Sequence, residues 1–289
     1  MAQDKAQRYT YILLKTGQQV ACAASNPMAS RFGQFLRRGC RYGGYASVGV
    51  GGFALVQAAH CRMTYRVMDE PQGAREGCAG ASLPGPPVRL LFVGDSICTG
   101  IGTNLAAPLQ VACAEALARL RNRPVVWTTV AQTGADVREL HAKLGEDDSQ
   151  RKFDVAVVFC GVNDGKKVLQ GRWPSVFRHD LSKLLADLRK EEPEAHIAVP
   201  RLQAYLFAPL MQQWPMKHLV RYFFDLFEAE KVKAAKDKAS TCPSPHPDQL
   251  ETMFSSSRES LWASDGVHPS AEGYRVAGEW LAEVLGARA

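Results

Sequence analysis

The sequence predicts an α/β fold in which a mostly parallel sheet is covered by helices on both faces. Short apolar runs with many β-branched residues alternate with longer segments whose apolar residues recur at helical spacing. The connections between these segments are short, so each helix can pack back against the sheet that its strand belongs to. No internal repeat interrupts the alternation.

Each expected strand and helix has its own pattern. The segments VRLLFV and FDVAVVFC are apolar runs, which are typical of parallel strands buried on both faces. The segment PVVWTTV is rich in β-branched residues, as strands are. Strands are expected at residues 88–93, 124–130, 153–160 and 196–200, and amphipathic helices at residues 104–120, 136–144, 173–190 and 270–285.

The positive charge of the chain is concentrated near its N-terminus. Nine Lys and Arg residues and no Asp or Glu lie between Lys5 and Met68, whereas the chain from Asp69 onward holds 26 basic and 28 acidic residues. The main domain therefore lacks the basic surplus of a nucleic-acid-binding protein. We expect a basic extension over residues 1–70, a Pro- and Gly-rich linker over residues 71–87 and one domain over residues 88–289.

An uncharged run of 18 residues, Tyr42–Ala59, follows three arginines of the extension. Its length reaches the threshold for a membrane-spanning helix, but five glycines and two polar residues lower its hydrophobicity. Three interpretations stay open: a signal-anchor or membrane-associated helix, an Arg-rich organelle-targeting region, and a packed or poorly ordered soluble extension. The sequence favours an intracellular protein and leaves membrane association through residues 42–59 open.

The eight cysteines are scattered and form no Cys-x-x-Cys pair. A chain of this length needs no disulfides, so we expect reduced thiols with a packing role, such as Cys160 in an apolar stretch. Cys242 with His246, and His60 with Cys61, are isolated pairs without a second pair at ligand spacing. A phosphate-binding Gly-rich loop is also absent from the sequence, so neither a metal nor a cofactor is expected.

The first candidate for catalysis is Ser96, in the sequence Gly94-Asp95-Ser96 directly after the strand VRLLFV. In an open parallel sheet, reactive groups gather at the carboxyl ends of the strands. A serine at this turn presents its hydroxyl to the crevice, and its backbone N–H is a ready donor for an oxyanion. The alternative is a helix-capping serine.

Two further turns after strands can supply oxyanion donors. Gly134 follows PVVWTTV, where a glycine lets the backbone N–H approach a ligand closely, although a plain turn glycine is the alternative. Asn163, in the sequence Gly161-Val162-Asn163-Asp164, follows FDVAVVFC. Its side-chain amide can donate to an oxyanion without a proton transfer, and an Asx turn is its alternative.

The last candidate pair is Asp265 and His268, in the sequence DGVHP before the final helix. A serine hydroxyl is a weak nucleophile until a base takes its proton, and imidazole exchanges protons near neutral pH. A carboxylate on the other ring nitrogen fixes the tautomer and stabilises the imidazolium. Taken alone, the pair also fits an N-capping Asp beside a surface His.

The four blocks together make the sequence similar to the SGNH/GDSL hydrolase superfamily, whose motifs are named for Ser, Gly, Asn and His. The resemblance covers roughly residues 88–286, because separated motifs match in order. It implies a flavodoxin-like three-layer α/β/α sandwich with a mostly parallel sheet. It also implies a role for each motif residue: Ser96 as nucleophile, Asp265 and His268 as its proton-relay partners, the oxyanion hole formed by Ser96, Gly134 and Asn163, and Gly94, Asp95, Gly161 and Asp164 as motif support.

Members of this superfamily are esterases, lipases, thioesterases or carbohydrate O-deacetylases. The resemblance therefore implies a hydrolase that cleaves a small-molecule, lipid or acylated-carbohydrate ester through an acyl-enzyme. Two alternatives stay open: a catalytically silent, membrane-tethered binding protein and an acyltransferase on the same fold. The absence of a G-x-S-x-G elbow argues against the α/β-hydrolase fold.

The sequence departs from the superfamily pattern at a few places. The first block reads GDSI rather than GDSL, a change of one branched aliphatic residue for another. Cys98 lies close to Ser96 but outside the motif, so we interpret it as a packing residue. Residues 229–260 read as a helix end followed by a long loop, which is either a lid or a surface insertion. The acyl and alcohol groups of the substrate and the oligomeric state do not follow from the sequence.

Overall fold

The chain divides into two units, of which the second, Gln57–Ala289, contains the predicted α/β domain. In this computed structural model the first unit is described only over residues 52–56, so most of the predicted extension and of the run Tyr42–Ala59 lies outside the described residues. No helix of the described part is long and apolar enough to cross a membrane. The structure describes residues 52–57, 59–61, 63, 65–66, 68–146, 151–202, 207–238, 240–245 and 261–287.

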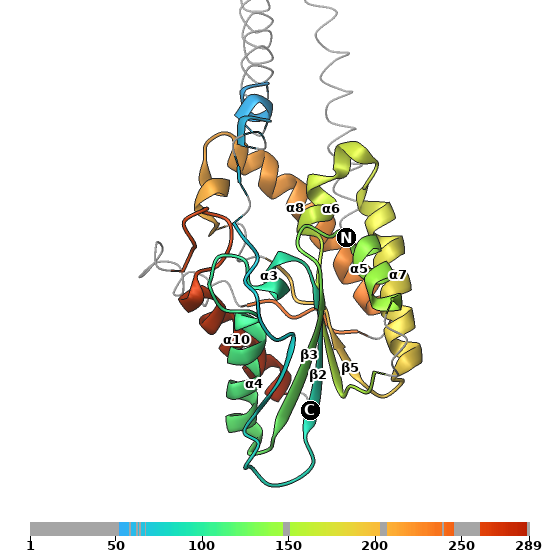
Figure 1. Ribbon diagram of the computed structural model, residues 1–289. Coiled ribbons are helices and arrows are strands. Elements are labelled where there is room, and N and C mark those ends of the chain that lie inside the picture. Colours follow the sequence, from blue (N-terminus) through green and yellow to red (C-terminus); the bar gives the residue numbers. More distant parts are fainter. Residues whose placement is uncertain are drawn as a thin grey trace, which may run out of the picture. The chain divides into compact units, whose positions relative to one another are not determined.

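The sheet contains five strands in the described part of the chain: β1 (Glu76–Ala79), β2 (Val88–Gly94), β3 (Val125–Ala131), β4 (Val155–Phe159) and β5 (His196–Ala198). Their order is β1-β3-β2-β4-β5 (Figure 1). Strands β2 to β5 are parallel, and β1 pairs antiparallel with β3 at the edge. Gly94, the last residue of β2, pairs with Ala131 of β3 and Phe159 of β4, so these three strands end level with one another.

The helices follow the strands along the chain. After β2 come α3 (Ser96–Thr99) and α4 (Pro108–Arg121), and after β3 comes α5 (Val137–Gly145). After β4 come α6 (Val162–Lys166) and α7 (Pro174–Glu191), with α8 (Met216–Asp237) after β5 and α10 (Ala271–Gly286) last. Two short 3₁₀ helices, Val168–Gln170 and Pro209–Gln212, lie in the connections.

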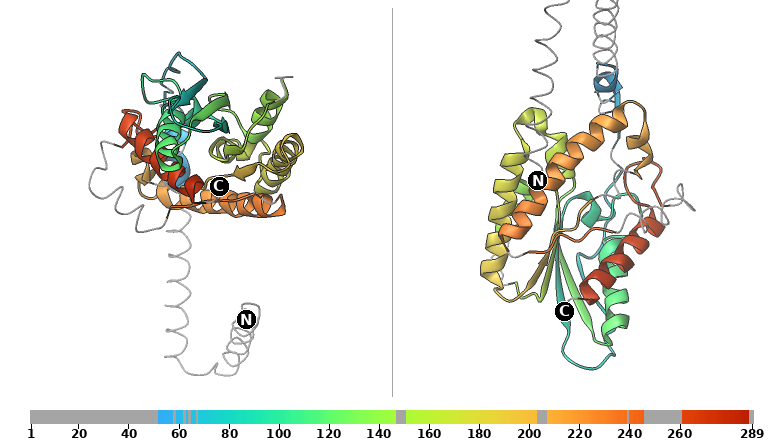
Figure 2. Two further views of the ribbon diagram at one scale, coloured as in Figure 1. Left: turned by 90° about the horizontal axis from the view of Figure 1, so that it is seen from below. Right: turned by 180° about the vertical axis from the view of Figure 1, so that it is seen from behind.

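Different helices cover the two faces of the sheet. Leu91 and Val93 of β2 pack in one hydrophobic cluster with buried residues of α5, α7 and α8. Leu90 and Phe92, which alternate with them, pack in a second cluster with α4 and α10. Figure 2 shows α7 beside α8 and α4 beside α10. The predicted three-layer α/β/α sandwich with a mostly parallel sheet is confirmed.

The four expected strands and four expected helices are all present, with shifted ends. The largest shift is at α4, which begins at Pro108 rather than at residue 104. Ala107 has a left-handed backbone with a φ of 53°, and Pro108 takes a first-turn position where its missing N–H costs no hydrogen bond. The helix therefore cannot extend toward the N-terminus.

The stretch predicted as a linker, residues 71–87, is partly a strand. Residues 76–79 form β1, and Gly77 pairs with Trp127 of β3. The linker prediction is therefore wrong for these residues. The sequence EGCA has little strand propensity of its own, and it is extended because it pairs with the open edge of β3. The sequence also did not predict the first half of α8.

Close packing of α10 against α4 predicts the effect of Gly278→Ala. A methyl group on Gly278 would lie 2.7 Å from Cβ of Ala112 and 2.8 Å from the carbonyl oxygen of Leu109. Helix propensity alone would favour alanine by about 1 kcal/mol. Because the backbone of α4 cannot yield locally, we expect a net loss of about 1–3 kcal/mol in the free energy of unfolding, measured with urea.

Gly145→Ala at the end of α5 is the matched control, because no atom lies within 4 Å of the added methyl group. We expect this variant to be as stable as the unchanged protein or slightly more stable. Equal stability of the two variants would contradict the packing argument.

Candidate active site

Ser96 begins α3 directly beyond the end of β2. Asp95 precedes it as the helix cap, and its carboxylate accepts a hydrogen bond from the backbone N–H of Ile97 at 3.2 Å. Gly94 allows the turn to pack tightly, because a methyl group there would lie 2.5 Å from Sγ of Cys98. The turn itself thus requires Gly94 and Asp95, whereas the side chain of Ser96 is left for contact with His268.

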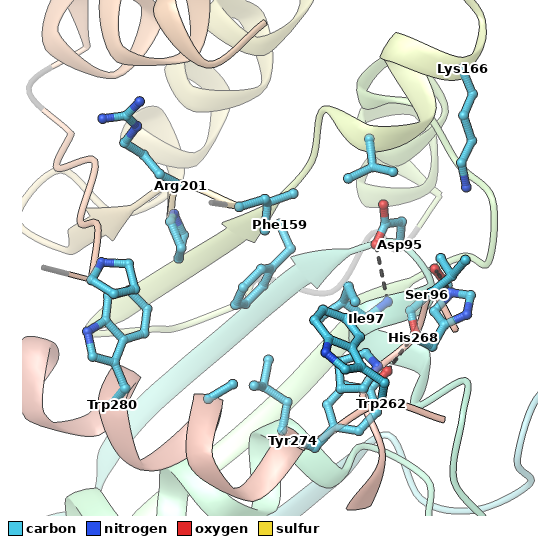
Figure 3. Close-up of a pocket in the computed structure, with 18 residues that line it drawn as sticks. Asp95, Ser96, Ile97, Phe159, Lys166, Arg201, Trp262, His268, Tyr274 and Trp280 are labelled. Atoms are coloured by element: carbon cyan, nitrogen blue, oxygen red, sulfur yellow. Dashed lines mark hydrogen bonds between the residues drawn. The ribbon is translucent and has the colours of Figure 1, made fainter. Parts of the chain in front are cut away.

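His268 lies between Ser96 and Asp265. Its Nε2 is 2.8 Å from Oγ of Ser96, and its Nδ1 is 2.6 Å from Oδ2 of Asp265. Figure 3 shows Ser96 and His268 facing each other at the edge of a pocket. The side chains of His268 and Asp265 are both buried. The structure therefore brings these three predicted residues into one hydrogen-bonded row.

The turn that carries Asp265 and His268 is held from within. Oδ1 of Asp265 accepts the backbone N–H groups of Val267 and His268, each at 2.9 Å. The backbone N–H of Ala263 donates to the carbonyl oxygen of His268 at 2.8 Å and closes the turn. Burial opposes ionisation of Asp265, but the hydrogen bonds from the His268 ring and the two backbone groups hold its pKa well below the ordinary value. The row therefore ends in a carboxylate.

Asn163 connects the three turns that follow β2, β3 and β4. Its amide nitrogen donates to Oδ2 of Asp95 at 2.9 Å and to the carbonyl oxygen of Ala135 at 3.0 Å. Gly134 next to Ala135 has a φ of 77°, with open space around a would-be methyl group. Its backbone conformation, rather than crowding, therefore requires glycine. Both N–H groups of the Asn163 amide are already used. An oxyanion at Ser96 can accept a hydrogen bond from this amide only if one of the two observed bonds is shared or replaced.

Asp164 and Gly161 have structural roles in the same loop. Gly161 precedes α6 as its N-terminal cap residue. Asp164 is fully buried and accepts hydrogen bonds from the backbone N–H of Val137 at 3.2 Å and from Nη2 of Arg172 at 2.7 Å. These contacts fix the short helix α6, which carries Asn163, to the start of α5.

Two tyrosines that were not predicted from the sequence contact the hydrogen-bonded row or the chain next to it. The hydroxyl of Tyr65 donates to Oδ2 of Asp265 at 2.9 Å. The hydroxyl of Tyr274, which is fully buried on α10, donates to the carbonyl oxygen of Ile101 at 2.8 Å, just after α3. The apolar face of the predicted final helix marks Tyr274 as buried. No sequence signal marks Tyr65, because its partner lies 200 residues away.

The chain after β5 is fixed by a buried carboxylate of α8. Glu228 accepts hydrogen bonds from Nε of Arg201 at 3.2 Å, the backbone N–H of Leu202 at 3.3 Å and Nζ of Lys231 at 2.6 Å. Lys231 is fully buried. Burial lowers its pKa, but the charge and hydrogen bond of Glu228, together with the nearby Cys160 and Cys242, raise it overall. This pair was not among the residues predicted from the sequence.

A mostly apolar pocket extends from Ser96 and His268 (Figure 3). In Figure 3, Trp280 and Arg201 lie at the end of the pocket away from Ser96. Trp262, six residues before His268 in the sequence, is part of the lining. The other apolar lining side chains include Ile97, Leu109, Phe159, Leu202, Val267 and Ala277.

The described cysteines are all free thiols, including Cys98 beside the nucleophile turn. Burial holds the pKa of Cys98 well above the ordinary value, so it stays a neutral thiol. Among the described residues, no cluster of His, Cys, Asp or Glu suits a metal ion.

A parallel α/β/α sandwich whose strand ends carry a serine, an imidazole and a carboxylate in one row has the architecture of a serine hydrolase. The sequence matches the GDSL-like lipase/acylhydrolase family over residues 92–276, and the chain belongs to this family. The protein is therefore an ester hydrolase of the SGNH/GDSL type, as the motifs predicted.

Solved structures of low sequence identity share the fold. An acetylxylan esterase from Geobacillus stearothermophilus is 21% identical, with a TM-score of 0.52 over 68% of this chain and 94% of that one. A lipase/acylhydrolase from Enterococcus faecalis is 16% identical, with a TM-score of 0.51 over 70% of this chain and 96% of that one. A search of curated protein sequences found no match.

The contrast between Cys98 and Cys78 provides a test of the site's packing. Cys78 is exposed on β1, whereas Cys98 is fully buried. We expect iodoacetamide to alkylate Cys78 in the folded protein and to leave Cys98 unmodified, as read by peptide mass spectrometry. Both should react after denaturation. Rapid alkylation of Cys98 in the folded state would show an accessible, reactive thiol and contradict its packing role.

Proposed function

We propose that the protein hydrolyses carboxylic esters through an acyl-enzyme on Ser96. The observation that carries the proposal is the row in which His268 lies 2.8 Å from the Ser96 hydroxyl and 2.6 Å from Asp265. With a proton on Nδ1 held by the carboxylate, Nε2 has a lone pair directed at the hydroxyl. This is the arrangement that a serine needs to become a nucleophile.

In the first half of the reaction, Oγ of Ser96 attacks the ester carbonyl carbon while Nε2 of His268 takes the hydroxyl proton. The tetrahedral intermediate collapses, and the imidazolium gives that proton to the departing alkoxide. The acyl-enzyme then reacts with water, which passes one proton to His268 as it adds to the carbonyl carbon. The second tetrahedral intermediate releases the carboxylic acid, and His268 returns the proton to Oγ of Ser96. Asp265 keeps the ring oriented and stabilises the imidazolium throughout.

The oxyanion of the tetrahedral intermediate needs donors on the other side of Ser96. The backbone N–H groups of Ser96 and Gly134 and the side chain of Asn163 are proposed for this role. The hydrogen bonds of Asn163 to Asp95 and Ala135 support it, because they tie the turns of all three donors together. The amide is therefore held beside the nucleophile turn, and it reaches the oxyanion by sharing or replacing one of these two hydrogen bonds.

The pocket favours an apolar group of the ester. Its lining is dominated by aliphatic and aromatic side chains, among them Leu109, Phe159 and Trp280. Burial of apolar surface in such a pocket stabilises an acyl chain or an apolar alcohol next to Ser96. Lipid and other apolar esters are thus better candidates than esters that are polar on both sides.

Replacement of Ser96 tests the nucleophile. Ser96→Ala should lose hydrolysis of p-nitrophenyl esters by several orders of magnitude and should no longer be labelled by a fluorophosphonate probe. Ser175→Ala, which changes an exposed serine of α7, should behave like the unchanged protein. Full activity in Ser96→Ala would refute the assignment. An unchanged protein that never reacts with the probe would instead favour a silent binding protein.

Replacement of Asn163 tests the oxyanion hole. Asn163→Ala should lower kcat by about 10²–10³-fold with little change in KM, because an oxyanion donor acts mainly in the transition state. Asn104→Ala, at an exposed loop position, serves as the matched control. A melting curve should accompany both variants, since Asn163 also holds two turns together. Nearly full kcat in folded Asn163→Ala would leave Asn163 with a structural role alone.

A further inference from the structure

Residues 65–66 and 68–70, which we call the strap, contact the candidate active site from outside the family match, which begins at residue 92. Tyr65 donates to Asp265 as described above. Ser264 donates to the sulfur of Met68 at 3.9 Å, and the hydroxyl of Thr133 donates to the carboxylate of Glu70. The strap therefore touches both the turn of the carboxylate and the turn that carries Gly134.

The hydroxyl of Tyr65 completes the hydrogen-bonding shell of the catalytic carboxylate. Oδ1 of Asp265 accepts two backbone N–H groups, and Oδ2 lies 2.6 Å from Nδ1 of His268. An ionised carboxylate has about four acceptor positions, and the Tyr65 hydroxyl occupies the fourth. The same hydroxyl lies 3.2 Å from Nδ1 of His268. It is therefore placed where the carboxylate and the ring meet.

We propose that Tyr65 is a positioning residue of the catalytic machinery: its hydroxyl fixes Oδ2 of Asp265 against His268 and withdraws part of the carboxylate's charge. This inference rests on the proposed role of Ser96, His268 and Asp265 in ester hydrolysis. It assigns a function to a segment that the sequence grouped with the extension and not with the hydrolase domain.

The protonation of both partners supports the hydrogen bond. Burial, followed by the hydrogen bond to Asp265, raises the pKa of Tyr65, so the phenol keeps its proton and remains a donor at neutral and alkaline pH. The pKa of Asp265 is held low, so the acceptor stays charged. A hydrogen bond from a neutral hydroxyl to a charged carboxylate is stronger than one between neutral groups.

Other charged and titratable groups also act on this pair. Asp95 lies before α3 and acts on His268, and Lys166 of α6 acts on Asp265. Tyr274 of α10 is the further titratable group facing the carboxylate. A change confined to the Tyr65 hydroxyl leaves these groups in place, so its effect on the pH profile can be separated from theirs.

Tyr65→Phe in the full chain tests the proposal. We expect kcat/KM for p-nitrophenyl acetate to fall about 5- to 20-fold, mainly through kcat, because the lost bond orients the base rather than the substrate. The acid limb of the kcat/KM profile should move to higher pH by about half a unit, since a carboxylate without this donor holds the protonated imidazole more tightly. The rate of fluorophosphonate labelling should fall in parallel.

Two control variants separate the hydroxyl from the strap. Tyr222→Phe removes a hydroxyl from an exposed tyrosine of α8 and should change neither rate nor pH profile. Glu70→Gln weakens the contact between the strap and Thr133 but leaves Tyr65 intact, so it should not move the acid limb of the pH profile. If Glu70→Gln and Tyr65→Phe lower kcat/KM by the same factor and neither moves the acid limb of the pH profile, the proposal is overturned. The strap would then act only by packing against the domain.

The remaining outcomes are equally decisive. A Tyr65→Phe variant with unchanged kcat and pH profile, or one in which only KM rises, would overturn the positioning role while Ser96→Ala still abolished activity. If Ser96→Ala kept full activity, the proposed function would fail and the role of Tyr65 would fail with it. Circular dichroism and a melting curve should show that Tyr65→Phe is folded.

Discussion

The register of the parallel strands is the constraint on which the site depends. Gly94 pairs with Ala131 on one side and Phe159 on the other, so three strands end at one level. The chain then leaves each strand into a turn, and these turns carry the nucleophile, Gly134 and Asn163. A shift of one residue in any strand would move its turn along the sheet and reverse the faces of its side chains.

The imidazole of His268 reaches the carboxyl ends of the strands only because the last part of the chain packs against the sheet. Ser96 and His268 are 172 residues apart, and the turn of His268 is placed by α10 against α4. Gly278 allows the two helices to approach closely. Tyr274 of α10 also bonds to the chain just after α3, so the same helix supports both sides of the Ser96–His268 contact.

Buried charges fix the loops around the site. Asp164 with Arg172 holds α6, the short helix that carries Asn163, and Glu228 with Lys231 holds the chain that lines the pocket after β5. Taking ions out of water is costly, and such pairs often contribute little net stability. Here each carboxylate also accepts a backbone N–H, from Val137 in the first case and Leu202 in the second. The first pair therefore fixes α6 against the start of α5, and the second fixes the chain after β5.

The sequence by itself determined the α/β class, the four parallel strands and the motif residues. The alternation of apolar runs with helical patterns, and the position of each motif directly after a strand, can both be read from neighbouring residues. Only the tertiary structure decided that residues 76–79 join the sheet, that Asn163 bonds to Asp95 and Ala135, and that Tyr65 reaches Asp265. Each of these depends on groups that are distant in sequence. These contacts are determined by strand pairing and helix packing. Neither produces a periodic pattern in the sequence that would identify the partner residues.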